Sequence, residues 1–257
     1  MTHSFSRLHC YEECPYEYYL SYIEKDPDRP KQGNFAAQNG SAMHKVFEEI
    51  LTNKIPIADG AERYLELYND IDEFTSETVM DNTYEKCVSY LEQIEPLDDR
   101  YEIIGVEKRL SFPLSIYKFI GIIDLILKDK KTGEIIIVDH KSSKHFLKKD
   151  GTPLKATLEE FNAYKKQMYL YCKAVENCMD LQVNKIVWHH FKDGGVLTVI
   201  PFDPAEYNNT VKWAENIIQD IKTDETFEAK QSYYRCKELC PFRETCEYLD
   251  DEEEEGD

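Results

Sequence analysis

Three β-rich segments follow one another in the middle of the chain and constrain its fold more than any other feature. They cover residues 101–112, 116–128 and 134–140, and they include the sequences YEIIGVEKRLSF, FIGIIDLILK and EIIIVD. Only short polar turns separate them, and such connections join antiparallel strands, because a parallel pair needs a crossover of a dozen or more residues. We therefore expect one sheet in which these consecutive strands pair antiparallel.

Helical periodicity is clearest before these strands, at residues 34–53. The apolar residues that recur there at the spacing of one helix face are Met43, Val46, Phe47, Ile50 and Leu51. Further helices are expected at 60–70, 74–94, 157–177 and 204–222, and further strands at 185–191 and 195–201. This order of elements predicts helices packed on a sheet, and the expected fold class is α/β or α+β.

No Gly/Ser-rich or Pro-rich linker and no internal repeat divides the 257 residues. We therefore expect one domain at residues 1–247, followed at 248–257 by a disordered tail rich in acidic residues. The formal net charge is −19, which argues against a protein that coats nucleic acid by bulk charge. Any binding of DNA must then be local.

The chain begins without the basic start and apolar core of a secretory signal. Its apolar stretches are far shorter than the ~20 residues that span a membrane. We expect a soluble, cytoplasmic protein with no membrane partner. In such a reducing compartment, the eight cysteines are expected to be free thiols or metal ligands.

Two aspartates lie in neighbouring strands of the predicted sheet. If the second and third β-rich segments fold about Lys131 and Thr132, then Asp124 and Asp139 lie opposite each other. Their Cβ atoms would be only ~4.5–5.5 Å apart, and like charges at this distance need a compensating cation. Mg²⁺ or Mn²⁺ would supply it. The alternative is that both aspartates end their strands at the surface and form ordinary ion pairs with Lys141.

Other residues of the candidate site lie on the same strand and on two helices. Lys141 follows Asp139 by two positions, so both side chains project from the same face. A lysine beside a metal can stabilise the charge that develops when a phosphodiester is attacked. His44 could supply an imidazole ligand, or it could be a hydrogen-bonded core residue. Gln167 and Tyr171, one helical turn apart, could contact a phosphate or hold the lysine.

Four short motifs occur in the order GSAMH (40–44), GIID (121–124), VDHK (138–141) and QMYLY (167–171). Together they resemble the motif series of the RecB-like branch of the PD-(D/E)xK nuclease superfamily. This branch includes the CRISPR-associated iron-sulfur exonucleases and the nuclease domain of the AddAB helicase-nuclease. The resemblance implies a restriction-endonuclease-like core, with a central mixed sheet flanked by helices.

The resemblance also implies a role for each matching residue. The implied metal ligands are His44, Asp124, Asp139 and the carbonyl of His140. The implied catalytic lysine is Lys141, supported by Gln167 and Tyr171. Asp139 is a departure, since many relatives carry glutamate there; the side chain is shorter but the chemistry is the same. Glu107 on the preceding strand could be an extra ligand, but we expect it at the surface.

Three cysteines, Cys236, Cys240 and Cys246, form a C-x3-C-x5-C pattern near the C-terminus. Four thiolates are needed to complete a tetrahedral metal site or a [4Fe-4S] cluster. Cys14, in the sequence CPYEYYL, resembles the first cluster ligand of the iron-sulfur nucleases, although these usually have two residues in the first C-terminal gap. The resemblance implies a [4Fe-4S] cluster that joins both ends of the chain, with Cys14 as the fourth ligand rather than Cys10.

Zinc is the alternative occupant of this four-cysteine site, because spacing alone does not distinguish the two. The remaining cysteines are expected to be buried thiols: Cys87, Cys172 and Cys178.

The expected function is that of a Mg²⁺- or Mn²⁺-dependent DNA nuclease. It would be an exonuclease on DNA ends or single strands, in recombination, repair or phage DNA metabolism. DNA could lie on the lysine-rich segment 128–173, unless this is merely a solvated loop. No GxxxxGK[ST] motif occurs, so a helicase or recombination protein would be a separate partner. The alternatives are a non-catalytic iron-sulfur or zinc module that binds DNA or recruits a helicase, and a phosphodiesterase acting on small nucleotides.

Overall fold

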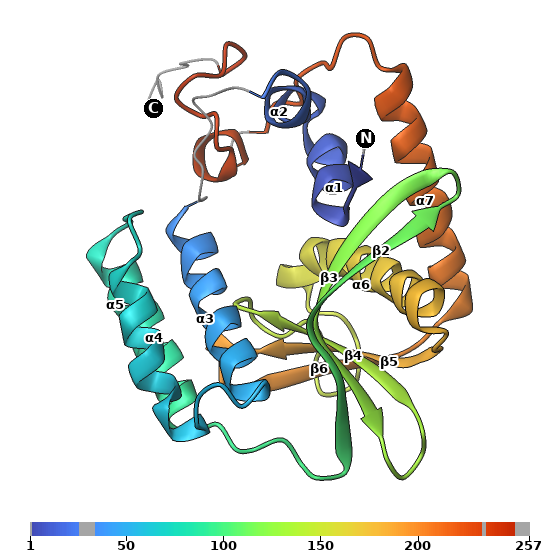
Figure 1. Ribbon diagram of the computed structural model, residues 1–257. Coiled ribbons are helices and arrows are strands. Elements are labelled where there is room, and N and C mark those ends of the chain that lie inside the picture. The colour runs from blue at the N-terminus through green and yellow to red at the C-terminus, as the bar shows by residue number, and fades with distance from the viewer. Residues whose placement is uncertain (1, 26–33, 233–234, 250–257) are drawn as a thin grey trace.

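A computed structural model describes residues 2–25, 34–232 and 235–249 of the chain. Within them, six strands form one mixed sheet, and helices pack on both of its faces (Figure 1). The strands are β1 (Thr2–His3), β2 (Tyr101–Leu114), β3 (Tyr117–Asp129), β4 (Ile135–Lys141), β5 (Val183–His190) and β6 (Val196–Pro201). The α-helices are α1 (Phe5–Glu13), α2 (Pro15–Tyr18), α3 (Phe35–Leu51), α4 (Gly60–Asn69), α5 (Glu77–Leu91), α6 (Leu158–Met179) and α7 (Pro204–Thr223).

The sheet is built around β3. β2 and β4 both pair antiparallel with β3, as the short turns between the segments predict. β5 then pairs parallel with β4, and α6 provides the long crossover that a parallel pair needs. β6 returns antiparallel to β5. The mixed sheet with flanking helices expected from the sequence is therefore confirmed.

One edge of β3 has a gap between two partners. β2 pairs with β3 along nearly its whole length, so β1 and β4 must share the opposite edge. β1 pairs there with Lys118 and Phe119, and β4 pairs from Leu125 onward. Residues 120–124 consequently have no strand neighbour on this edge. The gap separates the part of β3 inside the main sheet from the part that, with β2, extends toward α1 and α7 in Figure 1.

Two hydrophobic clusters hold the helices on the sheet. α6 places Met168, Tyr169 and Leu170 against strand residues such as Ile123 and Trp188, and all of these are at most 1% exposed. Each fully buried side chain of this size contributes roughly 1.5–3 kcal/mol. On the other side, α3, α4 and α5 form their own cluster, which continues to the sheet through Leu51 of α3.

The ends of the long helices follow the usual capping rules. Asn34 accepts a hydrogen bond from the backbone N–H of Ala37 at 3.1 Å and so caps α3. Asp203 caps α7 in the same way, and Pro204 occupies the first helical position, where no N–H is needed. α6 ends at Asp180, which has a left-handed backbone.

Some expectations lie outside the described residues or are wrong. The acidic tail from residue 250 onward is outside them. Cys87 and Cys172 are buried, as expected, but Cys178 is exposed. It lies in the last turn of α6, where its thiol donates to the Ser111 carbonyl at 3.4 Å at the surface. β1, α1 and α2 are not predicted from the sequence, because these elements are too short for a clear periodicity.

No α-helix in the described part of the chain has the length and apolar character needed to cross a membrane.

Glu12 connects α1 to α6 and α7. Its carboxylate accepts hydrogen bonds from Lys166 of α6, at 2.9 and 3.0 Å, and from the Trp213 indole of α7 at 2.7 Å. Burial alone would raise the pKa of Glu12. The nearby imidazole of His9 and the hydrogen bonds from Lys166 and Trp213 outweigh burial and lower this pKa to about 2.

We predict that Glu12→Gln lowers the free energy of unfolding by about 1 kcal/mol at pH 7. The effect is this small because the side chain is partly exposed and solvent screens its charge. The pKa of the folded state is below the unfolded value of ~4.3. The stabilisation is therefore complete above pH ~4.3 and disappears as the pH falls toward 2. Urea denaturation of the unchanged protein and of Glu12→Gln, at neutral and at acidic pH, measures this difference in the free energy of unfolding. An equal difference at both pH values would contradict the prediction.

Candidate active site

Three carboxylates form a row across β2, β3 and β4. In the register of the sheet, Glu107 of β2 lies opposite Asp124 of β3. The β3–β4 ladder ends at the pair Leu125 and Val138. One position further along, Asp139 of β4 faces Asp124 from the other side. The predicted register of this hairpin is therefore confirmed. Because three like charges meet on adjacent strands, the row needs cations to stabilise it.

Glu107 has an unusual backbone. Its φ of 45° is in the left-handed region, which costs a residue other than glycine about 1–2 kcal/mol. Its carboxylate Oε1 lies 3.6 Å from Nδ1 of His44. The expected surface position of Glu107 is therefore wrong, because this side chain belongs to the cluster. A strained residue in the middle of a strand leaves no signal in the sequence.

His44 comes to the carboxylates from the middle of α3. Its Nε2 donates a hydrogen bond to the His140 carbonyl at 3.0 Å, which leaves Nδ1 facing Asp124 Oδ2 at 3.4 Å. Burial by itself would lower the pKa of His44. The nearby carboxylates of Asp124, Glu107 and Asp139 outweigh burial and raise this pKa to about 9. The imidazole is consequently positioned to balance the charge of the row.

Asp124 is held in place by burial and by a contact with the backbone of β4. It is 6% exposed, and its Oδ2 accepts a hydrogen bond from the backbone N–H of His140 at 2.7 Å. Burial and the neighbouring charge of Asp139 raise the pKa of Asp124. A cation bound beside Asp124, in addition to the imidazole of His44, would stabilise the ionised carboxylate.

Lys141 lies between Asp139 and α6. Its Nζ is 2.7 Å from Asp139 Oδ2, and it donates a hydrogen bond to Gln167 Oε1 at 3.1 Å. Burial alone would lower the pKa of Lys141, but the Asp139 carboxylate outweighs burial and raises it. Gln167 in turn donates to the hydroxyl of Tyr171 at 2.8 Å. The two residues of the QMYLY motif therefore hold the lysine rather than standing apart from it.

Tyr164 also contacts the lysine and was not identified from the sequence. The ring centroid of Tyr164 lies 3.8 Å from Nζ of Lys141, a cation–π contact. Tyr164 precedes Gln167 by three positions on α6, so both lie on the same helix face. That spacing is the one signal that could have identified it.

Gly121 allows α6 to approach β3 closely. A Cβ atom at this position would lie 3.0 Å from the ring of Tyr171, which is closer than ordinary van der Waals contact. The glycine of the GIID motif therefore leaves space for the tyrosine of the QMYLY motif.

His140 contributes only its backbone to the site. Its imidazole Nδ1 lies 2.7 Å from Nδ1 of His189, and its ring packs on Phe47 with centroids 4.5 Å apart. Burial lowers the pKa of His140 well below its usual value, and burial lowers the pKa of His189 to about 4. Both rings are therefore neutral packing groups, and the His140 carbonyl is the group that reaches His44.

The residues of this cluster fit a divalent cation. His44, Glu107 and Asp124 each offer a ligand atom, and these atoms lie within 4.8 Å of one another. Asp139 is 2% exposed, and its Oδ2 lies 2.7 Å from the ammonium group of Lys141, so this carboxylate is held beside the cluster. Carboxylate oxygens with one imidazole and a carbonyl suit Mg²⁺ or Mn²⁺.

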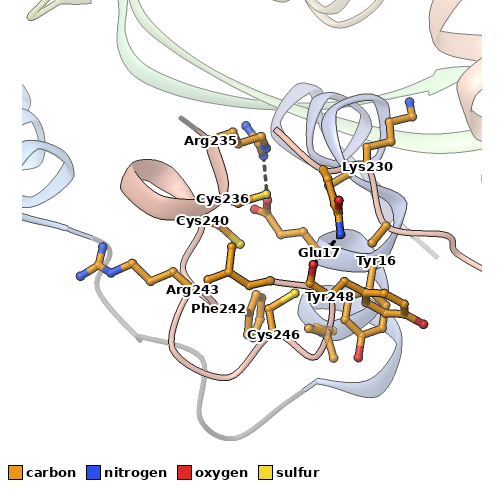
Figure 2. A pocket seen from close by; sticks show the side chains of 15 residues that line it. Tyr16, Glu17, Lys230, Arg235, Cys236, Cys240, Phe242, Arg243, Cys246 and Tyr248 are labelled. Carbon is orange, nitrogen blue, oxygen red and sulfur yellow. Dashed lines mark hydrogen bonds and ion pairs between the residues drawn. The ribbon is translucent and has the colours of Figure 1, made fainter. Parts of the chain in front are cut away.

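The four predicted cysteine ligands come together in a second place. Cys14, Cys236, Cys240 and Cys246 line one pocket between the start and the end of the described chain, and Figure 2 shows the last three. Cys10 does not line this pocket. Cys14 lies between α1 and α2 with an extended backbone, which the following Pro15 favours.

Backbone N–H groups point at three of these sulfur atoms. Ser232 donates to Cys236 Sγ at 3.4 Å, Phe242 donates to Cys240, and Tyr248 donates to Cys246. Burial raises the pKa of Cys240 to about 11 and also raises that of Cys246. Hydrogen bonds to sulfur stabilise a ligand thiolate, so the pocket fits a thiolate-bound metal or cluster.

Direct contacts also hold the two ends of the chain together around this pocket. Arg235 is paired with Glu17 at 2.7 Å, as Figure 2 shows, and the hydroxyl of Tyr16 donates to Glu247 at 2.8 Å. Glu17 is 9% exposed, so removing its cation would leave a charge nearly buried.

The lysine-rich segment 128–173 does not form one basic patch. Lys130 donates to the Asp99 carbonyl at the far turn of the β3–β4 hairpin, whereas Lys166 and Lys173 are paired with glutamates on α1 and α6. Lys141 is the member of the segment that lies in the site. Lysines that are close in sequence are therefore spread over different faces of the fold.

Comparison with known proteins identifies one family. A family model described as the PD-(D/E)XK nuclease superfamily matches residues 2–247. A crystal structure from Eubacterium rectale, named a "Putative exonuclease", superposes with a TM-score of 0.55 at 17% identity, covering 95% of this chain and 87% of the other. The structure of SSO0001 gives a TM-score of 0.32 at 15% identity, covering 93% and 95%. No curated protein sequence matches significantly.

Proposed function

Since the chain belongs to the PD-(D/E)XK nuclease superfamily and has its restriction-endonuclease-like fold, we propose that it is a divalent-metal-dependent DNA nuclease. The observation that carries this proposal is the convergence of Asp124, Asp139 and Lys141 on adjacent strands, with Lys141 Nζ 2.7 Å from Asp139. The cleavage is exonucleolytic, on DNA ends or single strands, as the RecB-like motif series implies.

In this proposal, the ligands of Mg²⁺ or Mn²⁺ are His44, Glu107, Asp124, Asp139 and the carbonyl of His140. When bound, such an ion polarises the phosphate and lowers the pKa of a water molecule. The ammonium group of Lys141 stabilises the negative charge that develops on the attacked phosphate. Gln167 and Tyr164 fix the position of that ammonium group.

The role proposed for the four-cysteine pocket is structural. Cys14, Cys236, Cys240 and Cys246 would hold a [4Fe-4S] cluster, with Zn²⁺ as the alternative. A group bound by all four would fix both ends of the chain to each other. Support comes from the shared pocket and from the N–H groups directed at the sulfur atoms. A separate helicase or recombination protein is the partner that the motif series implies.

The test is a cleavage assay of the purified protein. End-labelled linear DNA, both single-stranded and duplex, should be shortened from an end in Mg²⁺ or Mn²⁺, whereas closed circular DNA should persist. EDTA should stop the reaction, and Mg²⁺ added in excess should restore it. Cleavage of circles would contradict the exonuclease assignment. The absence of any metal-dependent cleavage would instead favour a non-catalytic DNA-binding module.

A further inference from the structure

A second groove lies beside the active site, on the side of the chain's start. We call it the N-terminal groove. The residues that form it are Thr2–Arg7, Arg109, Lys118, Ile120–Ile122 and Tyr171. It occupies the gap on the edge of β3, where β1 has ended and β4 has not yet begun. Asp124 lies at the β4 end of this gap and Lys118 at the β1 end.

The charge of this groove is opposite to that of the protein. Three cations, Arg7, Arg109 and Lys118, line it, and none of its described lining residues is an aspartate or glutamate. Arg109 and Lys118 are exposed, and no carboxylate in the described residues pairs with either of them. In a chain of net charge −19, such a local group of cations points to an anionic ligand.

The groove is connected to the active site by a chain of hydrogen bonds. Tyr171 lines the N-terminal groove, and its hydroxyl accepts from Gln167, which itself accepts from Lys141. Lys141, His44 and Glu107 line a separate hollow on the α3 side. An extended anionic chain that passes the cluster of carboxylates can therefore lie in the N-terminal groove on one side and in the hollow on the α3 side on the other.

The groove also presents apolar surface next to its cations. Ile122 is 42% exposed, and it lies opposite Arg109 in the β2–β3 ladder. A single strand of nucleic acid combines a charged backbone with the apolar faces of unpaired bases. In a duplex, these faces are stacked inside.

We propose that the N-terminal groove binds the phosphodiester backbone of a single DNA strand next to the phosphate that is cleaved. Arg109 and Lys118 neutralise its phosphates, and the strand runs along β3 from Asp124 toward Lys118. This inference rests on the proposed nuclease function and adds the path of the substrate to it.

The test compares two double variants that remove the same charge. Arg109→Ala/Lys118→Ala changes the groove, whereas Lys128→Ala/Lys131→Ala removes two exposed lysines at the far end of β3. Binding of a fluorescent single-stranded oligonucleotide is measured by anisotropy in EDTA. Without divalent metal the oligonucleotide stays intact, so the measurement reports binding alone. Circular dichroism verifies that both variants are folded.

The groove variant should bind the oligonucleotide about 20-fold more weakly at 0.1 M salt. The slope of log binding constant against log salt concentration should become shallower by about 1.4, because each of the two lost phosphate contacts on a single strand contributes ~0.7. The control variant should stay within about twofold of the unchanged protein. Equal loss in both variants would overturn the proposal, since net charge alone would then explain the binding. An equal loss of affinity for polyglutamate would also overturn it, in favour of an acidic protein partner.

The cleavage assay separates this inference from the proposed function. If the protein cleaves DNA, the groove variant should raise KM about as much as it weakens binding, and kcat should change less. A groove variant that lowers kcat with KM unchanged would contradict a role in strand binding. If the unchanged protein binds the strand but never cleaves it, the nuclease proposal fails while the binding comparison still decides the groove.

Discussion

Replacing Lys141 by methionine should lower the rate of DNA cleavage by about 100- to 1,000-fold, the usual effect of removing one group that stabilises the transition state. The ammonium group is the only part of the side chain that is lost, and its contacts with Asp139 and Gln167 are lost with it. Methionine keeps an apolar side chain of similar length, while the cation–π contact with Tyr164 is lost together with the ammonium group. The fold should therefore survive, and the loss should appear mainly in kcat.

Lys144→Met is the matched control for this experiment. Lys144 lies three residues further along the chain and is exposed, so its loss should leave kcat within about threefold. Asp124→Asn and Asp139→Asn should each reduce cleavage as strongly as Lys141→Met, because each removes a proposed metal ligand.

A double variant provides a stricter check. Asp139 and Lys141 are in direct contact, so Asp139→Asn/Lys141→Met should cost scarcely more than either single change. Multiplicative losses would show that the two side chains act independently. Full activity in Lys141→Met would rule out the catalytic role of the lysine.

The part of the site that the sequence predicts is the part that depends on local geometry. The β3–β4 hairpin closes through a short turn in which Gly133 has a φ of 77°, a conformation that glycine adopts without strain. A short turn fixes the register of the two strands, and the register places Asp124 opposite Asp139. The helical spacing of Gln167 and Tyr171 is equally local, and both residues lie where α6 passes Lys141.

What the sequence does not predict depends on contacts between distant segments. Glu107, which has a left-handed backbone, meets His44 from a segment more than 60 residues away in the sequence. The N-terminal groove combines residues from β1, α1, β2, β3 and α6, and no pattern along the chain connects them. Conversely, the lysine-rich segment 128–173 is prominent in the sequence, but the fold distributes its charges among several faces.

The four cysteines are an intermediate case. Their number and type indicate thiolate ligation, and the structure places all four around one pocket. Composition and spacing do not distinguish an iron-sulfur cluster from zinc, because both accept four thiolates. That distinction depends on the bound group itself and therefore requires chemical analysis of the protein.

Cys14→Ser and Cys246→Ser should each lower the stability of the whole protein by about 5 kcal/mol, or the Tm by roughly 15 °C. This estimate treats the bound group as a cross-link between the chain ends, whose loss releases a loop of more than 200 residues in the unfolded state. Anaerobically purified protein should be brown from sulfur-to-iron charge transfer and contain iron and sulfide in equal amounts. Both variants should be colourless.

Cys178→Ser is the control, because Cys178 is exposed and lies on α6, away from the pocket. It should keep the colour, the iron content and the Tm. Colourless protein with one zinc ion and no sulfide would retain the cross-link and reject the cluster. If Cys14→Ser kept both its iron and its Tm, the N-terminal ligand would be wrongly assigned. Cys10, one helical turn earlier, would then be the remaining thiol to replace, since four ligands must still come from both ends of the chain.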